Sequence, residues 1–400
     1  MKIALIGNMN NCFFAQMRYL RDFGIEAHLF MYQNEQELFL PQNDTFELEK
    51  YAPFIHTLSV ENSAKGLLLA DVSKVKEELK DFDFFVGCGV APALFKKMKW
   101  NLDVFIPYSD IIELTNYDSF RLEILPKYPV RLYATYQQRE AIKHNTTAVI
   151  AAAIQEKTIE KIKELHIEDK HIRKYLLMVY NKEKSVINPR YKAYIRQMKE
   201  SDFVVFSHAR HYWKGYVEKH EKKYGIKGLD KLIIGFAEFV RKNPDKNPLL
   251  VFFEYGVNVQ DSKALIDELG ITEYVLWLPR MVRKELLTLI DYADIVVDAL
   301  SAGMWGGVGF EGLSRGKIIM QNITQTDEEY QRIMGHPLPF IMRANSAKDV
   351  TKHLESFANN REYYIKKAKE NKEWFDKYAG IGLAKEYKAI FEKLYEEKVK

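Results

Sequence analysis

The sequence alternates between two kinds of segment, and this alternation constrains the fold more than any other feature. Short runs rich in β-branched and aromatic residues, such as KIALIG (2–7) and FDFFVGCG (82–89), are followed by stretches with helical periodicity. The same alternation begins again at DFVVFSHA (202–209) and continues to KIIMQN (317–322). Strands that alternate with helices are typical of a parallel sheet covered by helices. The sequence therefore predicts two consecutive α/β domains.

The length and composition are consistent with two domains. A chain of 400 residues with 47% apolar residues can bury a core in each of them. The segment 170–199 separates the two series and carries nine Lys or Arg but one acidic residue. We place the domains at 1–190 and 200–378, and expect a C-terminal helix at about 380–400 to pack back onto the first domain.

Charge and cysteine usage exclude several classes of protein. The net charge of +4 arises from 59 basic and 55 acidic side chains, so no overall electrostatic signature of nucleic-acid binding is present. Two cysteines, Cys12 and Cys88, argue against a disulfide framework and fit a reducing cytoplasm. We expect neither a signal peptide nor a membrane-spanning segment, because the apolar runs are too short.

Motifs for cofactors and metals are missing from the expected positions. The first loop, Gly7 to Asn11, lacks the Gly-x-Gly-x-x-Gly spacing of a dinucleotide site, which disfavours a nicotinamide enzyme. The ten histidines show no metal-binding pattern, and neither cysteine has a convincing catalytic histidine partner. We therefore expect neither a cofactor nor a metal.

A glycine cluster follows the expected buried strand DIVVDAL (294–300). Five of the 20 glycines fall between Gly303 and Gly312, and a helix opens within the cluster. The unpaired N–H groups at the start of a helix attract phosphate or sugar oxygens. Glu311, in the first turns of this helix, either contacts a ligand or only stabilises the helix through its dipole. The residues alone leave both interpretations open.

The second half of the chain resembles the C-terminal domain of family 4 glycosyltransferases, which are retaining enzymes of the GT-B fold. The resemblance rests on the order and spacing of segments that are individually weak: Ser207 to Arg210, Lys227 to Asp230, Phe252 to Gly256, Glu268 to Gly270, Trp277 to Pro279, Glu285-Leu286, Tyr292 to Asp294, Glu311 to Leu313 and Gly316-Lys317. The fold that it implies is α/β, with two Rossmann-like domains facing across a cleft, the second of which binds a nucleotide sugar.

The resemblance implies a donor site in the glycine cluster. Glu311 matches the second of two glutamates that mark this site with seven residues between them, and it would hold the ribose hydroxyls. Trp305-Gly306 occupies the position of a common Phe-Gly pair, and the amides of Gly306 and Gly307 would contact sugar or phosphate. Gly303 stands where the family has its first glutamate, so the usual contact to the donor sugar is missing.

The family's diphosphate-binding cations correspond to Arg210 and Lys227. A leaving diphosphate develops negative charge, which fixed cations stabilise. Lys214 is the alternative to Lys227 because it also precedes a glycine, although no helical pattern follows it. Each lysine could equally be a solvated surface charge. The backbone of Arg280 and Met281, in the loop LPRM (278–281), would line the nucleotide base.

The first domain resembles the family more weakly and would bind the acceptor. Asn10 and Asn11 follow the first strand and are candidate acceptor contacts, although this loop could be a plain strand-to-helix turn. Asp110 would contact the donor sugar or the attacking hydroxyl, or would only cap the next helix. Two basic segments with aromatic residues, 94–100 and 170–199, would face anionic lipid if the acceptor is lipid-linked, and are otherwise solvated helix faces.

These observations predict a cytoplasmic hexosyltransferase that binds a nucleotide sugar. It would move the sugar to a glycan or lipid-linked glycan during bacterial surface polysaccharide synthesis, with peripheral contact to the inner membrane. One alternative is a sugar-nucleotide epimerase or hydrolase on the same fold, with Asp110 and His208 as candidate residues. The other is a non-catalytic partner subunit that binds nucleotide, which the loss of the first glutamate makes conceivable.

Overall fold

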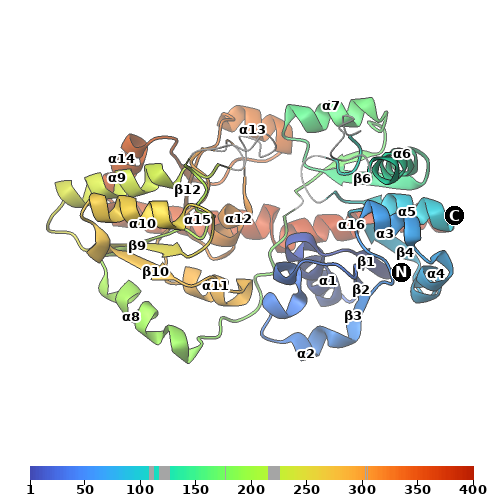
Figure 1. The fold of residues 1–400 in the computed structure, drawn as a ribbon, viewed down its shortest axis with the longest axis horizontal. Helices are drawn as coiled ribbons and strands as arrows, with labels where there is room; N and C mark the ends of the chain where they lie inside the picture. The colour runs from blue at the N-terminus through green and yellow to red at the C-terminus, as the bar shows by residue number, and fades with distance from the viewer. Residues whose placement is uncertain (108–111, 117–126, 176, 215–225, 302, 304) are drawn as a thin grey trace. The chain divides into compact units, whose positions relative to one another are not determined.

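The computed structural model describes residues 1–107, 112–116, 127–175, 177–214, 226–301, 303 and 305–400. The described residues form two compact units, shown in Figure 1. Unit 1 contains residues 1–180 and 379–400, and unit 2 contains residues 181–378. The C-terminal helix therefore belongs to the unit that begins the chain.

Unit 1 is built on a parallel sheet that has seven strands within the described residues, in the order β3-β2-β1-β4-β5-β6-β7. The strands are β1 (Lys2–Ile6), β2 (Glu26–Met31), β3 (Ile55–Thr57), β4 (Phe84–Gly87), β5 (Leu102–Phe105), β6 (Thr146–Ala151) and β7 (His171–Arg173). The helices are α1 (Cys12–Asp22), α2 (Leu48–Tyr51), α3 (Ala64–Leu69), α4 (Val72–Leu79), α5 (Ala91–Met98), α6 (Tyr128–His144), α7 (Glu156–Glu164) and α16 (Ile381–Val399).

Unit 2 contains a second parallel sheet, with six strands in the described residues and the order β10-β9-β8-β11-β12-β13. Its strands are β8 (Phe203–Phe206), β9 (Pro248–Phe253), β10 (Val275–Leu278), β11 (Ile295–Val297), β12 (Ile318–Gln321) and β13 (Ile341–Arg343). Its helices are α8 (Lys192–Glu200), α9 (Leu229–Lys242), α10 (Val259–Glu268), α11 (Arg283–Ile290), α12 (Gly307–Ser314), α13 (Asp327–Met334), α14 (Ala347–Asn359) and α15 (Arg361–Tyr378). The prediction of two Rossmann-like sheets is confirmed.

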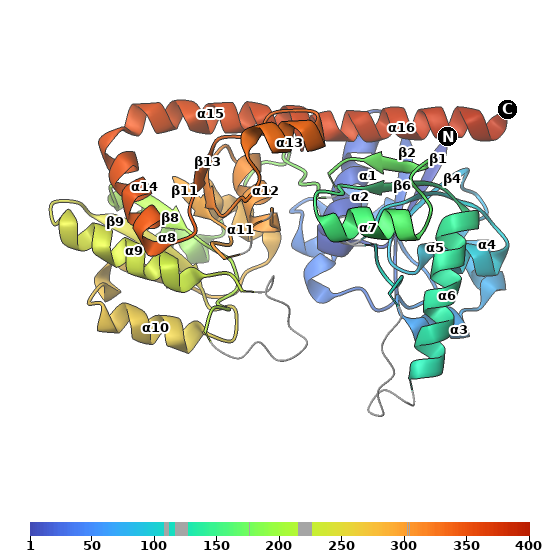
Figure 2. The ribbon, with the colours of Figure 1, turned by 90° about the horizontal axis from the view of Figure 1, so that it is seen from above.

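Both faces of the unit 2 sheet are covered at its centre, which explains why β8, β9 and β11 are apolar throughout rather than alternating. Ile318 and Met320 belong to the core cluster that includes α9 and α14, and Figure 2 shows these two helices side by side. Ile319 points to the opposite face, where its side chain meets Gly312 of α12. The glycine at this position lets α12 pack closely against the sheet.

The strand order places the loops that matter for function. In each sheet the order reverses at one point, between β1 and β4 in unit 1 and between β8 and β11 in unit 2. Ligands of open parallel sheets bind beyond the carboxyl ends of the strands at such a switch point. In unit 2 this position is flanked by the loop after β8 and by the glycine-rich segment after β11.

The helix α16 is part of the unit 1 core although it is the last element of the chain. The ring of Phe391 is fully buried and lies 5.4 Å from the ring of Phe84 on β4. Tyr387 donates a hydrogen bond of 2.7 Å to the carbonyl of Tyr175, and Lys398 lies 3.0 Å from the buried carboxylate of Asp103. These contacts join the C-terminus to strands formed much earlier in the sequence.

We expect Phe391→Ala to destabilise unit 1 by about 3–5 kcal/mol, because it removes a fully buried ring and leaves a cavity. The matched control is Val399→Ala on the same helix, since Val399 is mostly exposed. Urea unfolding measures both changes. A loss of less than about 1 kcal/mol for Phe391→Ala would contradict this packing of α16.

Candidate functional site

The loop after β8 is held in place by a buried hydroxyl. Ser207 is fully buried, and its Oγ donates a hydrogen bond of 2.8 Å to the carbonyl of Val297 at the end of β11. This bond crosses the switch point of the sheet and joins the two loops that flank it. His208 follows directly, so its position is determined by this connection.

A buried carboxylate organises the start of α12. Asp298 is 1% exposed and accepts hydrogen bonds from the backbone N–H groups of Ala299 (2.7 Å) and Gly309 (3.0 Å). The bond to Gly309 satisfies one of the N–H groups that the beginning of a helix leaves unpaired. Asp298 therefore fixes the glycine-rich segment against the end of β11, a role that the sequence analysis did not identify.

Glu311 lies at the centre of a buried charge cluster. Its Oε2 is 2.6 Å from Nε2 of His208, and its Oε1 forms an ion pair of 2.7 Å with Nε of Arg283. Burial raises the pKa of Glu311, but the Arg283 charge and the hydrogen bond from His208 outweigh this effect, so the pKa lies below its ordinary value. A carboxylate only accepts hydrogen bonds, so Nε2 of His208 is the donor in this contact.

This cluster changes the interpretation of Glu311. The sequence suggested either a ligand contact or a residue that merely helps the helix to start. In the structure each carboxylate oxygen already has a partner from another element, namely the loop after β8 and the helix α11. The sequence analysis missed Arg283 because this residue lies in no motif and reaches Glu311 only through the fold.

Lys227 and Arg210 lie on loops at the same edge of the sheet. Lys227 is held through its backbone, because its N–H donates to the carbonyl of Tyr212 and its carbonyl accepts from the N–H of Leu300 at 2.7 Å. Arg210 is exposed. Within the described part of the chain, no acidic side chain is paired with either cation. Their assignment to a diphosphate stays a prediction.

The structure distinguishes Lys214 from Lys227. The Nζ of Lys214 forms an ion pair of 2.7 Å with Asp261 on α10. Gly228, which follows Lys227, has a φ of 70° and lies so close to the loop after β11 that a Cβ would be 2.4 Å from Oγ of Ser301. The Lys227-Gly228 pair is thus packed against the glycine-rich segment, whereas Lys214 is neutralised on the surface.

The remaining donor candidates occupy loops around the same sheet. Arg280 is exposed between β10 and α11, with its guanidinium 5.1 Å from the centre of the Tyr255 ring, and Met281 beside it is half-buried. Trp305 is stacked on Trp374 at 6.2 Å. Gly306 caps α12 and Gly307 begins it, while Gly303 lies between β11 and α12.

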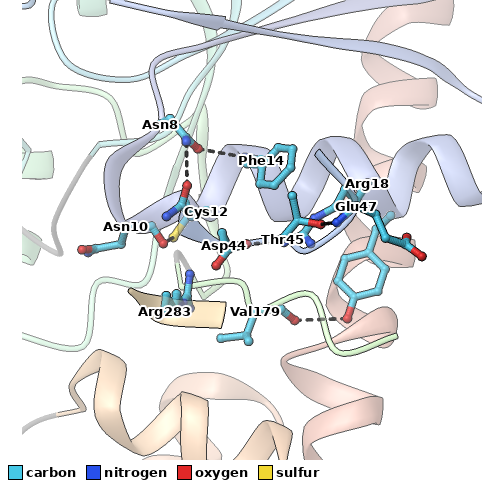
Figure 3. Close-up of polar contacts among 12 residues, drawn as sticks. Asn8, Asn10, Cys12, Phe14, Arg18, Asp44, Thr45, Glu47, Val179 and Arg283 are labelled. Atoms are coloured by element: carbon cyan, nitrogen blue, oxygen red, sulfur yellow. Dashed lines mark hydrogen bonds and ion pairs between the residues drawn. The ribbon is translucent and has the colours of Figure 1, made fainter. Parts of the chain in front are cut away.

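In unit 1 the candidate acceptor loop has an unusual backbone. Asn10 and Asn11 have φ values of 53° and 56°, in the left-handed region that non-glycine residues seldom adopt and that asparagine tolerates best. Nδ2 of Asn8 donates to Oδ1 of Asn11 at 2.9 Å. Oδ1 of Asn8 also accepts a hydrogen bond of 2.9 Å from the N–H of Phe14, and Figure 3 shows this contact. Asp110 lies outside the described residues.

In the two basic segments that the sequence singled out, the structure buries several of the aromatic and apolar side chains. Tyr175, Tyr180 and Tyr191 are buried, as are the apolar side chains of α5 at Leu94, Phe95 and Met98. These side chains form cores and are not available to a bilayer. Among the helices that the structure describes, none combines the length and the apolar character needed to cross a membrane.

The described residues do not gather into a metal site of ordinary composition. No three His, Cys, Asp or Glu side chains within them converge as a protein metal site would require. His208 and His211, three residues apart, have separate surroundings: His208 contacts Glu311, while Nδ1 of His211 lies 2.8 Å from Oγ of Ser262.

Comparison with known proteins identifies the fold. No protein-family model matches the sequence, and no curated protein matches it. Among solved structures, HepE from Anabaena in complex with UDP-glucose is similar over 100% of this chain and 99% of its own, with a TM-score of 0.59 and 13% identity. WaaG, a glycosyltransferase involved in lipopolysaccharide biosynthesis, is similar over 97% of this chain and 99% of its own, with a TM-score of 0.57 and 15% identity.

A third similar structure belongs to a different enzyme class. The UDP-GlcNAc 2-epimerase from Neisseria meningitidis, bound to UDP-GlcNAc, matches 98% of this chain and 100% of its own, with a TM-score of 0.56 and 14% identity. At such identities the likeness establishes the fold alone. The chain therefore has the GT-B fold, with two Rossmann-like sheets.

The close approach of Gly306 to Asp298 generates a prediction about stability. A Cβ at Gly306 would lie 2.5 Å from Oδ2 of Asp298, whereas a Cβ at Gly307 would meet nothing within 4 Å. We expect Gly306→Ala to lower the free energy of unfolding by about 1–3 kcal/mol through overpacking. The neighbouring Gly307→Ala is the control and should change it by less than about 0.5 kcal/mol. Equal effects in urea unfolding would argue against the close approach of Asp298.

The burial of His211 generates a prediction about pH. Its ring is fully buried against Phe252 and Trp277, and burial lowers its pKa from 6.5 to about 4. Between these values the unfolded chain binds a proton that the folded chain does not, so stability falls as the pH is lowered. Between about pH 7 and about pH 5, this effect should lower the free energy of unfolding of the wild type by about 2 kcal/mol. His211→Gln should abolish this part of the pH dependence.

Urea unfolding at the two pH values measures the effect, and the exposed His144→Gln is the control. A pH dependence in His211→Gln as steep as in the wild type would contradict a neutral, buried His211.

Proposed function

We propose that this protein is a glycosyltransferase that moves a hexose from a nucleoside-diphosphate sugar to a hydroxyl acceptor, with retention at the anomeric carbon. The observation that carries the proposal is the buried cluster of Glu311, His208 and Arg283 beside the glycine-rich start of α12. It lies at the carboxyl edge of the unit 2 sheet, where open parallel sheets bind ligands. The similar structure of HepE holds UDP-glucose.

Each candidate residue of unit 2 has a role in this proposal. Glu311 is held ionised and would accept hydrogen bonds from the two ribose hydroxyls of the donor. Arg210 and Lys227, whose charges no described acidic side chain neutralises, would stabilise the departing diphosphate. Fixed cations act on charge that develops in the transition state without having to reorganise. The amides of Gly306 and Gly307 would approach the sugar or the phosphate.

The remaining donor contacts would come from the loop between β10 and α11. The backbone of Arg280 and Met281 would line the nucleotide base. The positioning and electrostatic roles of these groups require no covalent nucleophile from the protein. We propose that neither a metal nor an organic cofactor takes part.

Unit 1 would bind the acceptor through the loop that contains Asn10 and Asn11, with Asp110 near the attacking hydroxyl. The left-handed backbone of both asparagines is a strained arrangement of the kind that clusters at binding sites. We propose a glycan or lipid-linked glycan as acceptor, in the synthesis of a bacterial surface polysaccharide at the cytoplasmic face of the inner membrane. The similar WaaG takes part in lipopolysaccharide biosynthesis.

A sugar-nucleotide epimerase is the second candidate. It is favoured by the close contact of a histidine with a glutamate at the same edge of the sheet, since such a pair can transfer protons. The similar UDP-GlcNAc 2-epimerase has this fold. Product analysis without an acceptor separates the two functions, because an epimerase converts the nucleotide sugar alone and a transferase requires the acceptor.

We expect one class among UDP-, GDP-, ADP- and CMP-sugars to raise the melting temperature of the wild type, because a ligand that binds only the folded state stabilises it. Glu311→Gln should lower the affinity for that nucleotide sugar by about tenfold or more, since it removes the negative charge to which the ribose hydroxyls would donate. The control is the exposed Glu273→Gln.

A shift that survives in Glu311→Gln would remove Glu311 from the donor site. No shift with any nucleotide sugar would contradict the proposed function. Binding without turnover, with a range of glycan acceptors, would instead indicate a non-catalytic partner subunit.

A further inference from the structure

Gln321 is a buried polar side chain whose hydrogen-bonding groups are unused. It is the last residue of β12 and is 0% exposed. Neither Oε1 nor Nε2 of its amide has a hydrogen-bond partner among the described residues. A buried amide without partners opposes folding, so a residue of this kind calls for an explanation other than stability.

The amide lies beside the start of α12. A Cβ built at Gly309 would be 3.1 Å from Oε1 of Gln321 and 3.3 Å from the indole of Trp305, so both side chains lie against this glycine. The Nε1 of Trp305 is likewise buried without a partner within the described part of the chain. The Trp305 atoms that approach Gly309 belong to the six-membered ring and not to Nε1, so the unused acceptor and donor beside this glycine are those of the Gln321 amide.

The position of the missing family glutamate adjoins the same strand end. A Cβ at Gly303 would lie 2.5 Å from Cγ2 of Thr324, three residues after Gln321, and Oγ1 of Thr324 donates to the carbonyl of Gly303 at 3.2 Å. A glutamate at 303 would have to displace Thr324. The side chain of Thr324 thus occupies the space that a side chain at position 303 would need.

The chemistry of the amide indicates what it would bind. A phosphate offers only acceptors and would leave Oε1 of Gln321 unpaired, whereas a hydroxyl both donates and accepts. From these observations we propose that the amide of Gln321 recognises a hydroxyl of the transferred sugar and determines which sugar the donor carries. This inference rests on the proposed function, because it assigns Gln321 to the same donor pocket.

The substitution Gln321→Met tests the proposal, because methionine has a similar length and no hydrogen-bonding amide. Calorimetry compares two ligands, the free nucleoside diphosphate and the nucleotide sugar of the base that raises the melting temperature most. We expect the variant to lose about tenfold or more in affinity for the nucleotide sugar, because a site built to bond a hydroxyl discriminates strongly. Its affinity for the nucleoside diphosphate should stay within about twofold, and its unliganded melting temperature should not fall.

The matched control is Gln16→Met in unit 1, since Gln16 is 2% exposed and its Nε2 also has no partner among the described residues. This control should change neither affinity. The inference would be overturned if Gln321→Met left the nucleotide sugar unaffected, weakened both ligands equally or lowered the unliganded melting temperature. A wild type that binds no nucleotide at all would instead refute the proposed function on which the inference rests.

Discussion

Burying a carboxylate is costly unless donors surround it, and unit 2 buries two of them at one edge of its sheet. Asp298 is compensated by the backbone N–H groups of Ala299 and Gly309, and Glu311 by His208 and Arg283. These partners come from the loops after β8 and β11 and from the helices α11 and α12. Satisfying both carboxylates therefore fixes four separate segments in one arrangement, and the shape and charge of the candidate site depend on it.

Close backbone approach is the second condition for this arrangement. A side chain at Gly306 would collide with Asp298, one at Gly228 with Ser301, and one at Gly312 with Val296 and Ile319. Three glycines at or near the carboxyl edge are thus required by packing alone. Gly307 has open space around it and is not required in this way. The glycine cluster consequently serves packing at some positions and leaves others available to a ligand.

Part of the site could be predicted because its signal is local. The glycine-rich segment after an apolar strand drew attention to Glu311, and the resemblance to family 4 glycosyltransferases assigned Glu311 and Lys227 to the donor site. The helical pattern that follows Lys227 distinguished it from Lys214. Arg283, Asp298 and Gln321 were missed, since nothing in their own sequence neighbourhoods distinguishes them. The buried tyrosines at 175, 180 and 191 show the reverse error, because aromatic residues among lysines suggested a surface where the fold makes a core.

The sequence by itself determined that the chain forms two parallel sheets covered by helices. Strands and helices can be predicted from patterns that extend over a few residues, because backbone hydrogen bonding is local and because the apolar residues repeat with the period of the element. Tertiary structure alone decided which partners each buried polar group received. His208 and Glu311 are 103 positions apart, and Ser207 and Val297 are 90 apart. A buried charge is compensated only by groups that lie close to it in space. Which groups these are depends on how the helices pack on both faces of the sheet.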